Sequence, residues 1–199
     1  MEESHVYLKK KATGQLVQAS LWDEVTDEHL ASWRRLWKPI MDAYCRRHEP
    51  RDKPEDHHWN WQCKADEWKA MLGYHSFALT CEGELQGLML LSDFRSARIQ
   101  TQFGKPLVYV EFLATAPWNR PEFQRPVRYS GVGTVMIMTA VELSQQLKYH
   151  GRIGLHSLPQ AESFYRGACG MTELGQDAAH QYLKYFEMTE NQAEEFRQV

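Results

Sequence analysis

A glycine-bearing segment in the middle of the chain has the residue types of an anion-binding turn. Residues 128–134 read RYSGVGT and stand between a buried strand, 108–115, and a long helix expected from about 131 to 149. Glycine lets the backbone approach a ligand closely, and the unpaired amides and dipole of a helix N-terminus favour negative charge. Arg128 and Thr134 add a guanidinium fork and a hydroxyl. The segment therefore predicts a phosphate-binding turn, unless the glycines merely begin a helix.

Two other phosphate-binding motifs do not fit the same segment. A Walker A loop requires lysine after its last glycine, whereas Thr134 follows Gly133 directly. A dinucleotide fingerprint requires a third glycine and an acid after the next strand. Position 136 is Met, and the strand expected at 152–157 has no terminal acid.

Three patterns in chain order give the segment a family resemblance. The turn Arg-x-x-Gly-x-Gly at 128–133 resembles the signature of the GCN5-related N-acetyltransferases (GNATs), and it follows a strand that exits as LATAP, 113–117. Residues 161–171, AESFYRGACGM, are similar to that family's A-x-x-F-Y-x-x-x-G-(F/M) helix and turn. The resemblance covers 108–188 well, whereas the first hundred residues agree only in the order of elements.

The resemblance implies an α/β (α+β layered) fold, with a mixed, mostly antiparallel central sheet, helices on both faces and a splayed parallel strand pair. That pair is expected at 108–115 and 152–157. It also implies one acyl-CoA N-acyltransferase domain over 1–199. Acetyl-CoA would be the acyl donor, and a primary amine would attack it directly in a ternary complex. A non-catalytic CoA-binding or protein-interaction module with the same fold is the alternative.

The same resemblance assigns cofactor contacts to two stretches. Main chain at the end of the first strand would bind the pantetheine, and the glycine turn would bind the pyrophosphate. The expected cofactor-binding residues are Phe112, Leu113, Ala114, Arg128, Ser130, Gly131, Val132, Gly133 and Thr134.

Three residues are candidates for moving protons. Tyr165 matches the family's tyrosine near the thioester sulfur, and a phenol with a pKa of about 10 can protonate a leaving thiolate. Glu111 is the only carboxylate among apolar neighbours on its strand, which makes it the candidate general base. His156, at the end of the next strand, is a second candidate base. The alternatives are structural: a helix residue packed on the sheet, an ion-paired strand residue and a strand-end histidine.

The segment 57–61, HHWNW, contains no aliphatic side chain and is a candidate acceptor site. Trp59 and Trp61 could stack on a cation or a ring, with Asp93 as a counter-charge. Anchoring of the loop by the two rings is an equal alternative. A zinc site from Cys45, His48, His57 or His58 and Cys63 lacks a short paired spacing, so no metal is expected.

Two features depart from the family pattern. Residues 118–127 lengthen the link before the glycine turn, and Arg120 or Arg125 could fold over the CoA phosphates or reach the acceptor. Leu158 stands where the family often has Asn.

Composition limits the other classes of function. The 199 residues include 23 basic and 26 acidic side chains, a formal charge of −3, with no polycationic segment. This disfavours nucleic acid and anionic membranes as partners and leaves a small-molecule or protein amine as acceptor. The sequence leaves a homodimer open. Without a long apolar run, and with four scattered cysteines, a cytoplasmic protein with reduced thiols is expected.

Hydrophobic periodicity and turn residues supply the elements that must position these groups. A helix capped by Thr26 should be kinked or split at Pro39, and the charged run 46–58 should be a solvated loop. The remaining expected elements are a strand at 14–21, a helix at 64–72, hairpins at 74–81 with 85–91 and at 97–102 with 107–114, a helix at 159–168, and one or two closing strands ending at 182–188.

Overall fold

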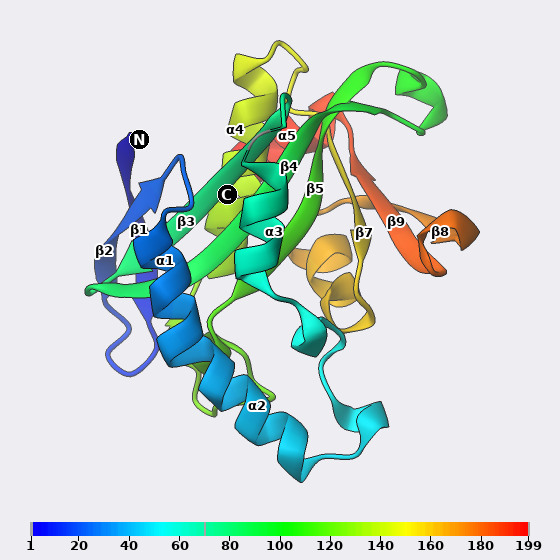
Figure 1. Cartoon of the computed structure of the whole chain (residues 1–199). Coiled ribbons are helices and arrows are strands. Elements are labelled where there is room, and N and C mark those ends of the chain that lie inside the picture. The colour runs from blue at the N-terminus through cyan, green and yellow to red at the C-terminus, as the bar shows by residue number, and fades with distance from the viewer. Residues whose placement is uncertain (1, 70, 199) are drawn as a thin grey trace. The chain divides into compact units, whose positions relative to one another are not determined.

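The computed structural model describes residues 2–69 and 71–198, which form nine strands and five α-helices (Figure 1). The strands are β1 Glu3–Lys10, β2 Leu16–Trp22, β3 Tyr74–Cys81, β4 Glu84–Ser96, β5 Pro106–Thr115, β6 Tyr129–Ser130, β7 Ile153–Ser157, β8 Thr172–Asp177 and β9 Leu183–Met188. The α-helices are α1 Asp27–Ser32, α2 Lys38–Arg47, α3 Trp61–Trp68, α4 Val132–Gln146 and α5 Glu190–Arg197.

The strands join in one mixed sheet. Their order is β6-β1-β2-β3-β4-β5-β7-β9-β8. β5 and β7 are parallel, and the pairs β1–β2, β1–β6, β2–β3, β7–β9 and β8–β9 are antiparallel. This is the fold class predicted from the sequence. No helix in the described part of the chain is both long and apolar enough to span a bilayer.

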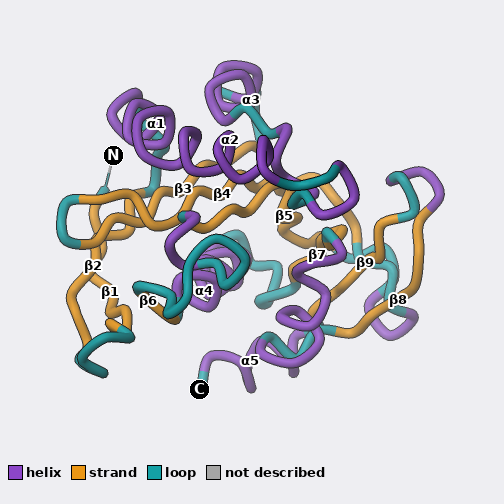
Figure 2. The backbone as a smooth tube through the Cα atoms, turned by 90° about the horizontal axis from the view of Figure 1, so that it is seen from below, coloured by secondary structure: helices purple, strands orange, loops and turns teal. Residues whose placement is uncertain are grey.

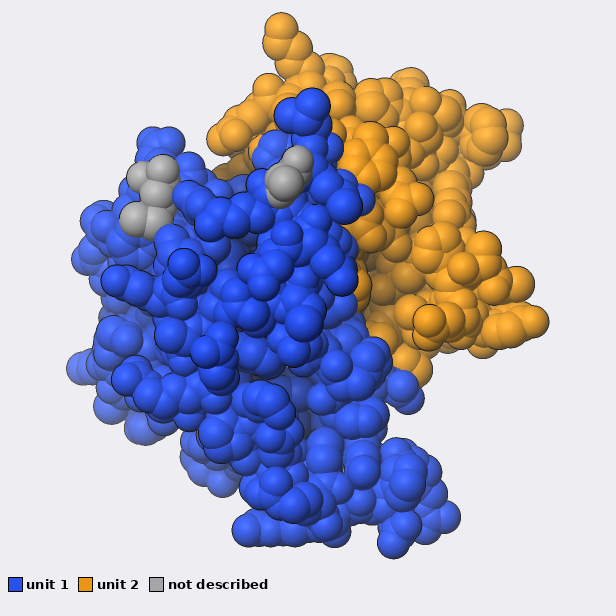
Figure 3. All heavy atoms as spheres, in the orientation of Figure 1, with its two compact units in different colours: residues 1–89, 113–136 blue, residues 90–112, 137–199 orange. Residues whose placement is uncertain are grey.

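The chain forms two compact units, coloured separately in Figure 3. Unit 1 contains residues 1–89 and 113–136, and unit 2 contains residues 90–112 and 137–199. β4, β5 and α4 each begin in one unit and end in the other.

Local signals explain the main turns of unit 1. Thr26 caps α1 through a capping box with His29, and a π-helical turn at Trp33–Trp37 separates α1 from α2, which carries Pro39 in its first turn. The two residues between β3 and β4, Glu82 and Gly83, both have positive φ, 50° and 77°. Such a turn matches the twist of a tight hairpin. α1, α2 and α3 lie on one side of β3 and the start of β4 (Figure 2).

One expected strand is absent, and β1, β6 and α5 were not expected. β1 was not predicted, because its one buried side chain, Leu8, gives no alternating pattern; the strand forms through seven residue pairs with β2. No strand forms at 97–102, because β4 continues to Ser96 and a 3-10 turn follows at Gln100–Gln102. The closing helix α5 was also missed, although Thr189 caps it through a capping box with Gln192.

In unit 2 the side chains of β5, β7 and β9 alternate between an apolar and a polar face. The apolar side chains are all buried: Val108, Val110, Ile153, Leu155, Phe186 and Met188. The second half of α4 and all of α5 lie on one side of these strands (Figure 2). The polar side chains on the other face are Tyr109, Glu111, His156, Tyr185 and Glu187.

The parallel ladder between β5 and β7 is short. It pairs Val108–Val110 with Ile153–Leu155 and ends there, although β7 continues to Ser157 and β5 continues past Glu111. The two strands therefore separate at their carboxyl ends, as the prediction of a splayed pair requires.

Candidate functional site

Glu111 is the first residue of β5 beyond the last pair with β7. Ser92 Oγ donates a hydrogen bond of 2.8 Å to its Oε1, and Arg95 Nη2 lies 3.5 Å from the same oxygen. No described residue donates to Oε2. Every fully buried side-chain polar atom of the described residues has a partner, so Oε2 is not fully buried. Oε2 therefore lies where solvent or a ligand can reach it, while Oε1 is held in place.

A hydrogen-bonded chain of three side chains lies on the same face. The Tyr109 hydroxyl donates to Nδ1 of His156, and Nε2 of His156 donates to Oδ2 of Asp177 over 3.0 Å. An ionised carboxylate only accepts, so Nε2 holds the imidazole proton and Nδ1 accepts. Burial lowers the pKa of His156 to about 4. At neutral pH His156 is therefore a neutral ring with both nitrogens engaged.

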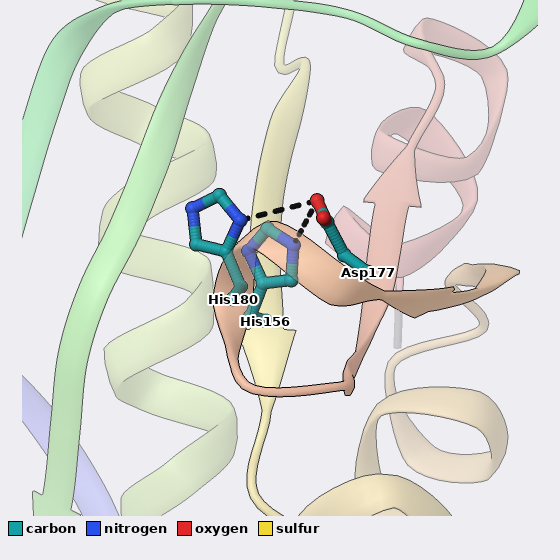
Figure 4. A group of neighbouring side chains, drawn as sticks. All are labelled: His156, Asp177 and His180. Carbon is teal, nitrogen blue, oxygen red and sulfur yellow. Dashed lines mark hydrogen bonds and ion pairs between the residues drawn. The ribbon is translucent and has the colours of Figure 1, made fainter.

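Asp177 gathers further donors (Figure 4). Arg98 Nη1 and His180 Nδ1 lie 2.6 and 3.1 Å from Oδ2, and the hydrogen bond from Arg98 is the largest cause that lowers the pKa of Asp177. The His180 ring stacks on His156, with centroids 3.8 Å apart. Asp177 is thus the charged centre that orients the histidine pair.

His156, Asp177 and His180 are also the one group of metal-ligand type among the described residues, with ligand atoms within 4.8 Å of one another. The carboxylate oxygen that a cation would use already accepts from three side chains, one of them the Arg98 guanidinium. A fixed positive charge at that oxygen repels a cation, so hydrogen bonding accounts for the cluster. Of the zinc-type residues weighed from the sequence, His48 and His57 have Nδ1 bonded to backbone carbonyls.

Tyr165 lies in a π-helical turn, Phe164–Ala168, and its ring packs against Phe186. The residue is 7% exposed, and burial raises the pKa of its phenol, which stays protonated at neutral pH. No described residue forms a hydrogen bond with the hydroxyl. Because every fully buried side-chain polar atom of the described residues has a partner, this hydroxyl is not fully buried. Its proton can therefore be given to a ligand.

In unit 1 the glycine turn has the form that a phosphate site needs. Gly131 has φ +97°, a conformation that favours glycine, and its carbonyl accepts from Val135 N over 2.9 Å at the start of α4. The amides of Val132, Gly133 and Thr134 have no acceptor among the described residues. Gly131 is exposed, and Gly133 and Thr134 are half-buried. The residues present fit a diphosphate group.

Arg128 is only partly available at this turn. Its Nη1 pairs with Glu84, its guanidinium stacks 4.7 Å over the Trp118 ring, and its side chain is 37% exposed. The other guanidinium donors have no partner in the part of the chain that is described. Ser130, in β6, is held by pairing with Lys9 of β1. The conformation of the glycine turn is therefore fixed before a ligand binds.

The predicted acceptor residues do not behave alike. Trp61 is buried at 2% exposure, so its ring offers no face to a ligand and anchors α3. Trp59 is half-buried, and the Lys64 ammonium lies 5.2 Å from its ring centroid. Burial lowers the pKa of Lys64 to about 8. Asp93 is half-buried on β4 in unit 2. A role in acceptor binding stays a prediction for Trp59 and Asp93.

The segment 118–127 has a structural role that the sequence did not predict. Arg120 binds Asp56 through two hydrogen bonds, of 2.7 and 3.0 Å, and also binds Glu122. The side chains of Arg120 and Asp56 are only 11% and 7% exposed, so this arginine is committed to the protein. Asp56 also corrects the expectation of a fully solvated 46–58 loop. Arg125, the other candidate, donates to the Pro121 carbonyl.

Several residues on the polar face of unit 2 were not predicted from the sequence: Ser92, Arg95, Arg98, Tyr109, Asp177 and His180. Ser92, Arg95 and Arg98 stand three residues apart in the chain, and so do Asp177 and His180. These two groups and Tyr109 come together only across long sequence separations, and no motif connects them.

Comparison with known proteins gives the class of the fold. No protein-family profile matches the chain, and no curated protein is significantly similar in sequence. Arylalkylamine N-acetyltransferase 7 from the yellow fever mosquito Aedes aegypti is a structural neighbour with a TM-score of 0.55 and 15% identity, covering 94% of this chain and 95% of that one. FeeM, an N-acyl amino acid synthase from uncultured soil microbes, has a TM-score of 0.53 and 12% identity, covering 89% and 93%.

A third neighbour is an uncharacterized protein from Bacillus halodurans, with a TM-score of 0.55 and 8% identity over 97% of this chain and 94% of that one. At such identities the likeness shows the fold alone. The chain has the GNAT fold, as its sequence resemblance to the GCN5-related N-acetyltransferases implied.

Proposed function

We propose that the protein is an acyl-CoA-dependent N-acyltransferase that moves an acetyl group from acetyl-CoA to a primary amine. The observation that carries the proposal is the opening of the β5–β7 ladder, with Glu111 directly beyond the last pair and its Oε2 accessible. Beyond the last pair, the facing main chains of the two strands no longer pair with each other and can hydrogen-bond an extended, amide-containing ligand.

Two parts of the chain would hold the donor. Main chain of Phe112, Leu113 and Ala114 would contact the pantetheine, and the amides that open α4 would bind the pyrophosphate. When bound, acetyl-CoA would supply the acyl group as a thioester.

Glu111 is the group best suited to take a proton from the acceptor amine. Its Oε2 has no protein partner, and Ser92 fixes the other oxygen. His156 suits this role less, because its side chain is 4% exposed, Nδ1 accepts from Tyr109, and its pKa is lowered to about 4. It serves instead to hold the Tyr109 hydroxyl.

Tyr165 is the proposed acid. Glu111 Oε2 receives one proton from the ammonium, and the amine nitrogen then bonds to the acyl carbon as the carbon–sulfur bond breaks. The nitrogen gives its second proton to solvent as the neutral amide forms, and the Tyr165 hydroxyl protonates the departing thiolate. Proton exchange with water then resets both groups. The names of two fold neighbours, an N-acetyltransferase and an N-acyl amino acid synthase, describe acylation of nitrogen and agree with this class.

The test is release of free thiol from acetyl-CoA in the presence of a panel of primary amines, with the acylated amine identified by mass spectrometry. Reactions without amine correct for the protein's own thiols, of which Cys63 is exposed. We expect saturable, amine-dependent release that Glu111→Gln largely abolishes. Binding of CoA without amine-dependent release would favour the alternative, a non-catalytic CoA-binding module. Absence of CoA binding would overturn the proposal.

A further inference from the structure

Arg95 is a fixed cation that the protein itself leaves largely unpaired. It lies near the end of β4, its side chain is 44% exposed, and its guanidinium stands 5.2 Å from the Tyr109 ring centroid and 5.6 Å from that of Phe94. No described residue accepts a hydrogen bond from it, and its one ion pair, to Glu111, is 3.5 Å long. The neighbouring aromatic rings thus hold the guanidinium in place, while its N–H groups make no hydrogen bond to a described residue.

Other arginines of the molecule show how unusual this arrangement is. Charged partners at hydrogen-bond distance engage four of them, in the pairs Arg98–Asp177, Arg120–Asp56, Arg128–Glu84 and Arg166–Glu173. Among the described arginines, Arg95 is the one that combines neighbouring aromatic rings with a half-exposed guanidinium beside the candidate base. This combination is typical of an arginine that binds an anionic ligand.

Resting on the proposed function, we infer that Arg95 and Glu111 together select an acceptor that is an α-amino acid. The two opposite charges lie 3.5 Å apart. An α-amino acid carries its ammonium and carboxylate on one carbon, so that nitrogen and oxygen are about 3 Å apart from standard bond lengths. The carboxylate would replace Glu111 as the partner of the Arg95 fork, and the ammonium would donate to Oε2 of Glu111.

The surrounding residues keep this pair in register. Ser92 holds Oε1 of Glu111, and His156 holds the hydroxyl of Tyr109, whose ring supports Arg95. Asp177 orients His156 in turn. An amine without a carboxylate would leave the guanidinium without its partner, and an ω-amino acid would place its two charges too far apart.

Matched acceptor pairs test the inference. Thiol release is measured with phenylalanine against phenethylamine, histidine against histamine, and glutamate against 4-aminobutyrate. We expect kcat/KM for each α-amino acid to exceed that of the matched amine by about 10²-fold, because an amine without an α-carboxylate leaves the Arg95 guanidinium unpaired. Arg95→Gln should remove this preference, mainly by raising KM for the amino acid, so that kcat/KM for phenylalanine falls toward that for phenethylamine. Arg51→Gln, at a surface arginine of unit 1 that is 85% exposed, is the matched control and should keep the preference.

Binding gives a second readout that does not depend on turnover. Phenylalanine should raise the melting temperature of the parent protein more than phenethylamine does, and Arg95→Gln should abolish that difference. Equal rates and equal shifts within each pair would overturn the inference while the proposed function stands. Loss of activity by Arg95→Gln toward both members alike would also overturn it. Absence of thiol release from every amine would overturn the proposed function, whereas the melting shifts would still decide whether Arg95 binds a carboxylate.

Discussion

Two arginine–carboxylate pairs, one in each unit, differ in how fully the protein satisfies them. In unit 1, Arg120 binds Asp56 through two nitrogen–oxygen contacts of 2.7 and 3.0 Å, binds Glu122 as well, and is nearly buried. In unit 2, Arg95 and Glu111 approach only to 3.5 Å, and the arginine side chain is 44% exposed. Each pair joins an arginine to a carboxylate, but the geometry differs.

The difference separates a structural pair from a pair suited to binding. Two charges removed from water must satisfy each other, so a saturated pair such as Arg120–Asp56 joins the 46–58 loop to the 118–127 segment. A loose, partly exposed pair contributes little to stability and can exchange partners with a ligand.

The largest expected effect is on turnover, from Glu111→Gln. Loss of a general base should lower kcat/KM by about 10²–10⁴-fold. The melting temperature should change little, because the amide can still accept from Ser92. Steady-state thiol release and thermal unfolding measure the two quantities. A variant that turns over at the parent rate would remove Glu111 from the mechanism.

Asp56→Asn should show the reverse pattern. Removing the charge of Asp56 leaves the nearly buried Arg120 with Glu122 as its remaining carboxylate partner, and the broken buried pair should still cost about 3 kcal/mol of unfolding free energy. Urea unfolding measures the loss, and Asp52→Asn, at a residue with a side chain 54% exposed, is the control. If Asp56→Asn proves as stable as the control, the pair does not join the two segments as described.

The third effect is on the pH dependence of stability. The pKa of His156 is about 4 in the folded protein, against about 6.5 in an unfolded chain. Between these values the unfolded chain binds the extra proton, so stability should fall as pH drops from 6.5 to 4, by about 3 kcal/mol for this group.

His156→Gln should flatten that part of the profile, which urea unfolding at pH 7.5, 6, 5 and 4 would measure. His5→Gln, at a histidine with a side chain 59% exposed, provides the comparison. An unchanged slope in His156→Gln would assign the acid sensitivity to other groups.

Gly131→Ala should lower stability less than Asp56→Asn does. A side chain at φ +97° is strained, and the cost should be about 1–2 kcal/mol. Binding of CoA should weaken as well, because the turn that directs the amides of α4 is displaced. Gly14→Ala, at φ +73° in a separate turn, should lose similar stability and keep CoA affinity. Calorimetric titration with CoA tests this, and equal affinities in the two variants would reject the phosphate-binding turn.

Local chemistry made part of the molecule predictable. The cap at Thr26, the hairpin turn at Glu82 and Gly83, and the glycine turn before α4 each depend on a few adjacent residues. The order of strands and helices over 108–188 follows from hydrophobic patterning together with these turns. The fold class and the candidates Glu111 and Tyr165 were predicted from these patterns together with the resemblance to the GCN5-related N-acetyltransferases.

Contacts between distant residues could not be read in this way. Nothing near Glu111 in the sequence indicates Ser92 or Arg95, and nothing near Arg120 indicates Asp56. The sequence by itself determined the turns, the alternation of the strands and the residue types on each face. Only the tertiary structure decided which charges are saturated and which stay open, because strand pairing and loop packing fix those distances across long separations in the chain.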